Sequence, residues 1–202
     1  NCEGINGVLP LVGGKYLVDV ATGDVFFSNR IEEQVTCFEN LSDDYGIIHT
    51  NAEMIDENTK TIGFHTEQKN IKISTGEVYV DIVERYFLCP PTMLVKKEIF
   101  DVLQGYDEGL AYEDWDFLVR TARVYKIHYL DKVLTKRRVL KNSMYSLFFK
   151  RGNYKMLEST YKICEKIHEL NRTKEEDKAL VKRIHHEMKY ALKSKHYNLC
   201  LL

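Results

Sequence analysis

The order of strand-like and helix-like segments is the feature that most limits how this chain can fold. Up to about residue 140, short segments rich in β-forming residues are separated by segments with helical apolar spacing. After that point only helical spacing is found, in residues 142–170 and 173–197. The pattern predicts an α/β unit over residues 1–141 and a C-terminal helical extension over residues 142–202.

The elements of the α/β unit follow from apolar spacing and from residues that end helices and strands. Pro90 and Pro91 end the segment 78–87, whose spacing fits a helix or a strand; a helix is the preferred interpretation. The other helices are expected at residues 29–41, 97–103 and 113–124. Strands are expected at residues 15–20, 46–55, 92–95, 126–130 and 133–138, with a polar loop and a weak hairpin at 56–70.

The charge balance argues against nucleic acid as the main partner. The 202 residues include 29 Lys and Arg and 30 Asp and Glu, which gives a net charge of −1. Basic residues are frequent from Lys126 onward, so the C-terminal third could contact an anionic membrane surface or an acidic partner. Solvated helix faces explain the same charges and are the preferred interpretation.

The cysteine pattern predicts a reducing compartment. Five cysteines are widely spaced and form no CxxC pair, which argues against a disulfide framework and against a zinc site. No apolar run reaches the roughly 18 residues that a membrane-spanning helix needs. We therefore expect a cytoplasmic protein, with work at the inner face of the membrane as an alternative. The chain begins at Asn1 without an initiator Met, so we expect it to be a piece of a longer protein.

Acidic residues gather around the start of the helix expected at residues 113–124. Asp107 lies in a turn framed by glycines (GYDEG), and the motif EDWD begins the helix at Glu113. The free N–H groups at a helix N-terminus stabilise an ionised carboxylate, and a carboxylate held there suits a general base. Ordinary N-capping by acidic residues is the preferred interpretation when the cluster is taken alone.

Two further groups of residues could bind a phosphate-bearing ligand. Asp24 follows a strand end beside a flexible glycine, where a carboxylate can hold a divalent cation, although Gly-Asp is also ordinary turn chemistry. Lys136, Arg137 and Arg138, with Lys141 close by, could bind a diphosphate or an acidic acceptor, or could protect an exposed edge strand. None of the seven histidines has metal-ligand spacing, and the chain has no P-loop and no GxGxxG motif.

In this order the segments resemble the family 2 glycosyltransferases, which share the GT-A fold. Residues 15–34 (KYLVDVATGDVFFSNRIEEQ) are similar to that family's strand, acidic motif and following helix. Residues 91–143, with GYDE, EDWD and Arg138 in order, are similar to its acceptor half. The resemblance covers about residues 6–146. It implies an α/β fold with a GT-A-like mixed sheet flanked by helices and truncated at the N-terminus.

The resemblance also implies a reaction. A sugar would pass with inversion from a UDP-, GDP- or TDP-sugar to a hydroxyl of a glycan or lipid-linked acceptor, with Mg²⁺ or Mn²⁺ on the diphosphate. By position, Asp114 corresponds to the base, and Glu113 lies beside the acceptor or orients the base. Asp24 corresponds to the last Asp of the metal motif, so Asp24 and Asp114 are expected to face each other across one cleft. By the same resemblance, donor-binding roles are expected for Asp24, Arg138 and Lys15, and substrate-binding roles for Trp115, Tyr112 and Asp107.

The chain departs from the family pattern in ways that weaken metal and donor binding. Where the family reads Asp-Ser-Asp-Asp, this chain reads ATGD, so Asp24 is the one carboxylate left. A His often found two residues after the family's conserved Arg is replaced by Leu140. A first nucleotide-binding unit of roughly 80 to 90 residues is expected to be missing upstream of Asn6.

A non-catalytic module is the alternative to an enzyme. A degenerate domain kept for binding or assembly would also show the eroded acidic motif. Its helical extension would then be a surface for a partner or for a second copy, through apolar residues at Leu147, Phe148, Met156, Ile163 and Ile167. Packing of this apolar face onto the α/β unit is the preferred interpretation, because monomers rarely expose large apolar patches.

We predict that this chain alone binds nucleotide-sugars weakly or not at all, because the resemblance implies an incomplete base pocket. Calorimetric titration with UDP-, GDP- and TDP-sugars in the presence of Mn²⁺ should show no micromolar binding. Micromolar affinity for any of these donors would contradict the prediction.

Overall fold

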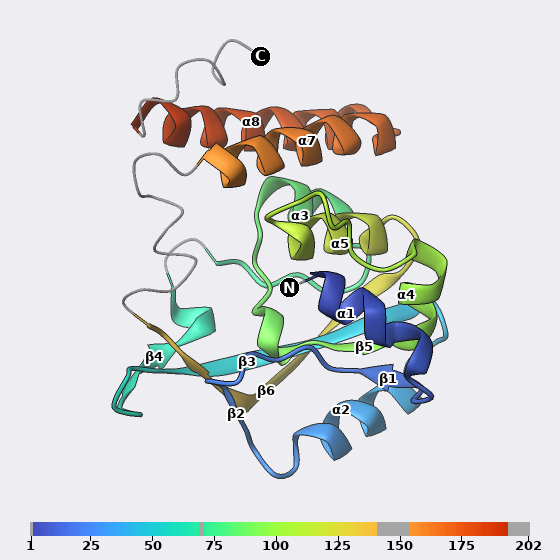
Figure 1. The fold of residues 1–202 in the computed structure, drawn as a ribbon, viewed down its shortest axis with the longest axis vertical. Helices are drawn as coiled ribbons and strands as arrows, with labels where there is room; N and C mark the ends of the chain where they lie inside the picture. The colour runs from blue at the N-terminus through green and yellow to red at the C-terminus, as the bar shows by residue number, and fades with distance from the viewer. Residues whose placement is uncertain (1, 69–70, 141–153, 194–202) are drawn as a thin grey trace.

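The computed structural model describes residues 2–68, 71–140 and 154–193. A mixed sheet separates two groups of helices (Figure 1). Helix α2 covers one face of the sheet, and helices α1, α3, α4 and α5 lie over the other face. The pair α7 and α8 lies on the far side of α3 and α5 and does not touch the sheet in this view. The C-terminal helices therefore form an outer layer.

Within the described residues, six strands form one sheet in the order β1-β5-β3-β6-β2, with β4 paired to β3. Strands β3 and β6 run parallel, and the other pairs are antiparallel. The strands are β1 (Tyr16–Leu17), β2 (Val25–Phe26), β3 (Tyr45–Ile55), β4 (Thr61–Phe64), β5 (Leu94–Lys96) and β6 (Lys126–Arg138). The helices are α1 (Cys2–Val8), α2 (Arg30–Glu39), α3 (Tyr79–Glu84), α4 (Lys97–Leu103), α5 (Glu113–Ala122), α7 (Tyr154–Leu170) and α8 (Lys174–Lys193), with 3₁₀ turns η1 (Leu9–Leu11), η2 (His65–Glu67) and η3 (Pro90–Thr92). The predicted mixed α/β class with flanking helices is confirmed.

The pairing of β3 with β6 forms the centre of the sheet. Ile47, Ile48 and Ile55 of β3 are fully buried, as expected for a strand with helices on both of its faces. The two strands stay paired along almost their whole length, up to Ile55 opposite Arg138. The pairing therefore fixes where the C-terminal end of β6 lies.

Several predicted elements differ in the structure. Residues 126–138 form one strand rather than two, because the exposed pair Asp131 and Lys132 bulges out where the register with β3 shifts. The strand predicted at residues 15–20 is reduced to β1, and β2 was not predicted. Helix α1 was also missed, because it is short and has no buried residue, so it carries no clear apolar period. The helices expected near 29–41, 78–87, 97–103 and 113–124 are confirmed.

The C-terminal helices pack back onto the α/β unit, as the preferred interpretation predicted. Ile163 and Ile167 of α7 are fully buried, and with Ala179 and Leu180 of α8 they join the main hydrophobic core. The predicted apolar positions 147 and 148 lie outside the described residues, as do the predicted start of the first C-terminal helix and the end of the second. Among the described residues, no helix has the length and apolar character needed to cross a membrane.

A group of ion pairs joins α7 to the start of α5. The Lys166 ammonium lies 2.6 Å from Asp107 Oδ2 and 2.9 Å from Asp116 Oδ1. The Asp116 side chain is 2% exposed, and its other oxygen accepts a hydrogen bond from Arg120 Nε at 2.8 Å. Burying this carboxylate is costly unless both of its oxygens are paired, so Lys166 and Arg120 are required together.

We predict that Lys166→Met lowers the free energy of unfolding by about 2 kcal/mol, because it leaves Asp116 buried with one cationic partner. The loss should be below that for a fully buried pair, since the Lys166 side chain is 35% exposed. Urea unfolding measures the change, with Lys162→Met, an exposed lysine of the same helix, as the matched control. Equal stability of the two variants would contradict a structural role for Lys166.

Candidate active site

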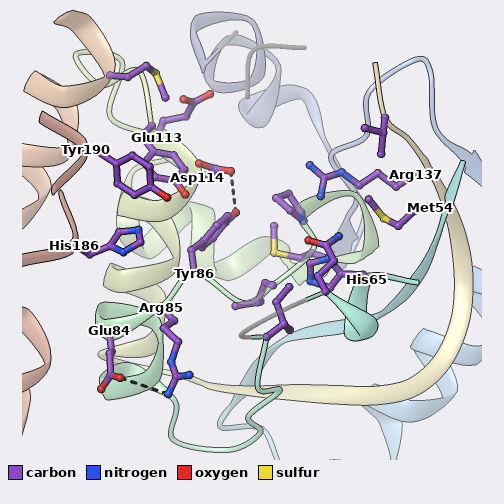
Figure 2. A pocket seen from close by; sticks show the side chains of 18 of the residues that line it. Met54, His65, Glu84, Arg85, Tyr86, Glu113, Asp114, Arg137, His186 and Tyr190 are labelled. Atoms are coloured by element: carbon purple, nitrogen blue, oxygen red, sulfur yellow. Dashed lines mark hydrogen bonds and ion pairs between the residues drawn. The ribbon is translucent and has the colours of Figure 1, made fainter. Parts of the chain in front are cut away.

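A cleft of about 1460 Å³ opens between the C-terminal end of β6 and the helices α5 and α8. Figure 2 shows its two walls, with acidic and phenolic groups between them. The middle of the cleft carries Tyr86, Glu113 and Asp114, the sheet side carries Met54, His65 and Arg137, and the helical side carries His186 and Tyr190. One concave site therefore joins the end of the sheet, the start of α5 and the C-terminal helix.

Asp114 is the acidic group whose environment is most unusual. It is half-buried in the first turn of α5, and its Oδ1 accepts the Trp115 backbone N–H at 2.8 Å. Its Oδ2 accepts the Tyr86 hydroxyl at 2.8 Å. Burial raises the pKa of Asp114 to about 6, and the hydrogen bond from Tyr86 opposes that rise. A carboxyl with this pKa is ionised at neutral pH and is a better proton acceptor than an ordinary Asp.

Tyr86 holds the Asp114 carboxylate from the loop that follows α3. Burial, and then the negative charge of Asp114, raise the pKa of the Tyr86 phenol well above 10. The phenol therefore stays neutral and donates its proton to Asp114 throughout the physiological range. Nothing in the sequence marked Tyr86, because its contact with Asp114 joins residues 28 positions apart and only the folded chain brings them together.

The basic residues at the end of β6 divide between the two faces of the strand. Arg137 points into the cleft (Figure 2), where its Nη1 lies 3.9 Å from the Cys89 sulfur. Arg138 borders the cleft, but its guanidinium donates to the carbonyls of Gly23 at 3.1 Å and Asp56 at 2.9 Å. Neighbouring side chains on a strand point to opposite faces, which explains the division. Donor binding was expected for Arg138 from the family resemblance, and both arginines border the cleft, but Arg137 is the one whose guanidinium points into it.

Asp24 lies next to the cleft and is not among the residues that line it. Its Oδ1 accepts the Arg138 backbone N–H at 2.8 Å. In the described ranges, no group of three or more His, Cys, Asp or Glu residues could hold a metal ion. One carboxylate is nevertheless compatible with Mg²⁺, which often takes most of its ligands from phosphate oxygens and water. The donor set thus fits a cation that arrives with a diphosphate, and it does not form a metal site of protein groups alone.

The remaining predicted site residues fall into two groups. Tyr112 and Glu113 line the cleft beside Asp114. Lys15 is exposed just before β1 and is not among the residues that line the cleft; its ammonium lies 5.2 Å from the centre of the Tyr16 ring.

Two more predicted site residues are part of the framework. Trp115 of α5 is fully buried, and its indole N–H donates to the Ile82 carbonyl of α3 at 3.1 Å. Asp107 pairs with Lys166, and this hydrogen-bonded ion pair lowers its pKa. Both residues hold the start of α5 in place and do not face the cleft.

Helix α8 forms a cleft wall that sequence reasoning missed. His186 and Tyr190, one turn apart, contact each other edge to face at 4.7 Å between ring centres. The Lys182 ammonium lies 2.8 Å from Glu84 Oε2, and the Arg183 guanidinium lies 3.8 Å from the centre of the Trp115 ring. These contacts fix α8 against α3 and α5. The helical spacing of the sequence indicated only a packed helix and carried no signal for this wall.

Comparison with known proteins gives the class of the fold. No protein-family model matches the chain. An uncharacterized glycosyltransferase of Methanocaldococcus jannaschii is 29% identical over 136 residues, which are 66% of this chain and 45% of the relative. An uncharacterized glycosyltransferase of Rickettsia typhi is 25% identical over 132 residues, which are 62% of this chain and 40% of the relative. The chain spans less than half the length of these relatives.

Two solved structures have the same fold. TarS residues 1–349 of S. aureus superimpose with a TM-score of 0.64 at 14% identity, covering 94% of this chain and 52% of that fragment. The mannosyltransferase PcManGT of Pyrobaculum calidifontis, in complex with GDP-Man and Mn²⁺, gives a TM-score of 0.63 at 9% identity, covering 97% of this chain and 52% of that one. The chain has a glycosyltransferase fold.

We predict that Tyr86→Phe raises the pKa of Asp114 above about 6, because it removes the hydrogen bond that favours the ionised carboxylate. A ¹³C NMR titration of the aspartate carboxyls measures the shift. Tyr129→Phe is the matched control, since Tyr129 donates to Asp131 at 3.0 Å away from the cleft. An unchanged or lowered pKa of Asp114 in Tyr86→Phe would show that this hydrogen bond does not set its ionisation.

Proposed function

We propose that this chain is the acceptor-side part of an inverting glycosyltransferase that transfers a sugar from a nucleotide-sugar to a hydroxyl of a glycan or lipid-linked acceptor. The observation that carries the proposal is Asp114, a half-buried carboxylate with a raised pKa that lines a large cleft. The glycosyltransferase fold supports the same conclusion. Because the chain spans less than half of its relatives, the activity is proposed for the complete protein.

In the proposed reaction, Asp114 takes the proton of the acceptor hydroxyl while the acceptor oxygen attacks the anomeric carbon. The bond from that carbon to the diphosphate oxygen breaks on the opposite side, and its electron pair leaves with the diphosphate. Inversion follows from attack opposite the leaving group. Glu113, beside Asp114 in the cleft, is placed to contact the acceptor or to orient the base. Tyr86 keeps the carboxylate ionised and fixes its position.

The donor in this proposal is a UDP-, GDP- or TDP-sugar, with Mg²⁺ or Mn²⁺ on its diphosphate. PcManGT, which has the same fold, was solved with GDP-Man and Mn²⁺. In this chain Asp24 would supply a carboxylate ligand to the cation, and the bound cation would neutralise charge on the leaving diphosphate. The Arg138 backbone N–H, which holds Asp24 Oδ1, would keep that carboxylate oriented.

A non-catalytic binding or assembly module remains the second candidate. It is favoured by the single carboxylate of the acidic motif and by apolar side chains that α8 leaves exposed, with Val181 51% exposed and Leu192 50% exposed. Self-association through the C-terminal helices and contact with a membrane surface stay predictions under both candidates. The candidates separate on one point, because only the enzyme depends on the ionised carboxylate of Asp114.

We predict that Asp114→Asn in the full-length protein lowers turnover by at least about 100-fold, because the amide cannot accept the proton. Turnover is measured as nucleoside diphosphate release from UDP-, GDP- and TDP-sugars, with a cell extract as the source of acceptor. The matched control is Asp101→Asn, an exposed carboxylate on α4 that pairs with Lys97. A wild-type rate in Asp114→Asn would exclude Asp114 as the base.

The pH dependence of the rate should report the same group. Asp114 acts only when ionised, so the wild-type rate should rise with pH and level off above about pH 6. Stability should depend on pH in the opposite direction from the rate. A carboxyl whose pKa is higher in the folded than in the unfolded state stabilises the fold when it is protonated. Its contribution is therefore lost as the pH rises through about 6, and Asp114→Asn should be at least as stable as wild type at pH 7. A rate independent of pH between 5 and 7, with chemistry rate-limiting, would contradict the assignment.

A further inference from the structure

The three basic residues at the end of β6 have three different environments. Lys136 lies 3.2 Å from the Glu53 carboxylate, and its ammonium is 5.6 Å from the centre of the Phe27 ring. Arg138 is bound by carbonyl groups of two turns. Arg137, between them in sequence, points the other way and into the cleft. A cluster that reads as one basic patch in sequence is therefore split by the alternation of the strand.

Arg137 is a half-buried cation without a carboxylate partner in the described part of the chain. The group within reach is the Cys89 sulfur at 3.9 Å, and burial raises the pKa of the Cys89 thiol to about 11, so this thiol is neutral at physiological pH. A neutral thiol at that distance compensates little of the cost of removing a guanidinium from water. Cations in such places are normally paired, so the guanidinium is available to an anionic ligand in the cleft.

The strand register fixes the backbone position of Arg137. Arg137 lies opposite Met54 on β3, and Met54 lies opposite Gly63 on β4. Two residues beyond Gly63, His65 lines the same wall, and its Nε2 lies 2.8 Å from the Phe87 carbonyl. Burial, and to a smaller extent Arg137 itself, lower the pKa of His65, which keeps its ring neutral. The sheet wall thus presents the charge of Arg137 on a fixed strand, facing Asp114 across the cleft (Figure 2).

We propose that Arg137, rather than Arg138, binds the diphosphate of the donor in this cleft. The inference rests on the proposed function for the identity of the ligand, and it adds the residue that holds the leaving group. A guanidinium fork matches two phosphate oxygens, and it would stabilise the charge that develops as the sugar–oxygen bond breaks. Arg138 acts on the framework, because its Nε and Nη1 already donate to the Gly23, Asp56 and Glu57 carbonyls and to the Thr59 hydroxyl.

Inorganic pyrophosphate, titrated without divalent cation, tests the site apart from sugar transfer. By calorimetry at low salt, wild type and Lys136→Gln should bind pyrophosphate alike, and Arg137→Gln should bind at least about tenfold more weakly. Arg137→Lys should recover part of the affinity, because it keeps the charge and loses the fork. Inorganic phosphate should bind more weakly than pyrophosphate. Equal affinity for the two anions would indicate a single-phosphate site and overturn the assignment to a diphosphate.

A second measurement keeps the test independent of how the variants fold. In the wild-type protein, the Arg137 Nε–H resonance should shift on addition of pyrophosphate, and that of Arg138 should shift less. Equal losses of affinity in Lys136→Gln and Arg137→Gln, or no shift at Arg137, would overturn the inference. If Arg137 binds pyrophosphate and the full-length protein transfers no sugar, the anion site stands and the proposed function fails. If transfer occurs and Arg137→Gln changes neither binding nor turnover, the function stands and this inference fails.

Discussion

The parallel pairing of β3 with β6 is the constraint on which the rest of the structure depends. Helix α5 leads directly into β6, so a close turn sends the strand back along the helix. This arrangement brings the first turn of α5 and the last residues of β6 to the same cleft. Asp114 and Arg137 therefore face each other because the sheet determines where β6 ends, although 22 residues separate them in sequence.

The burial and the hydrogen-bond partners of the acidic residues determine the electrostatics of the cleft. Burial raises the pKa of Asp114, and the hydrogen bond from Tyr86 opposes that rise by favouring the ionised carboxylate. The two neighbouring acids are used differently, because Asp107 and Asp116 anchor Lys166 and with it the outer helices. The acidic residues between positions 107 and 116 thus have two roles. Asp114 lines the cleft, and Asp107 and Asp116 hold α7 in place through Lys166.

The sequence predicted the backbone better than the site. Helices α2, α4 and α5 and strand β3 have strong apolar periods. These periods predict whether each segment is a helix or a strand and roughly where it lies in the chain. The acids at the start of α5 were identified because a helix N-terminus favours them. Three features could not be read from the sequence: the contact of Tyr86 with Asp114, the opposite directions of the Arg137 and Arg138 side chains, and the wall formed by α8. Each depends on a long-range contact or on which face of a strand points inward.

The most direct test of the account is a crystal structure of the protein soaked with a nucleoside diphosphate and Mn²⁺. We expect diphosphate oxygens at the Arg137 guanidinium, on the sheet side of the cleft that contains Asp114, and Asp24 as a ligand of the cation. A diphosphate bound elsewhere on the molecule, with the cleft between Arg137 and Asp114 filled only by water, would contradict it.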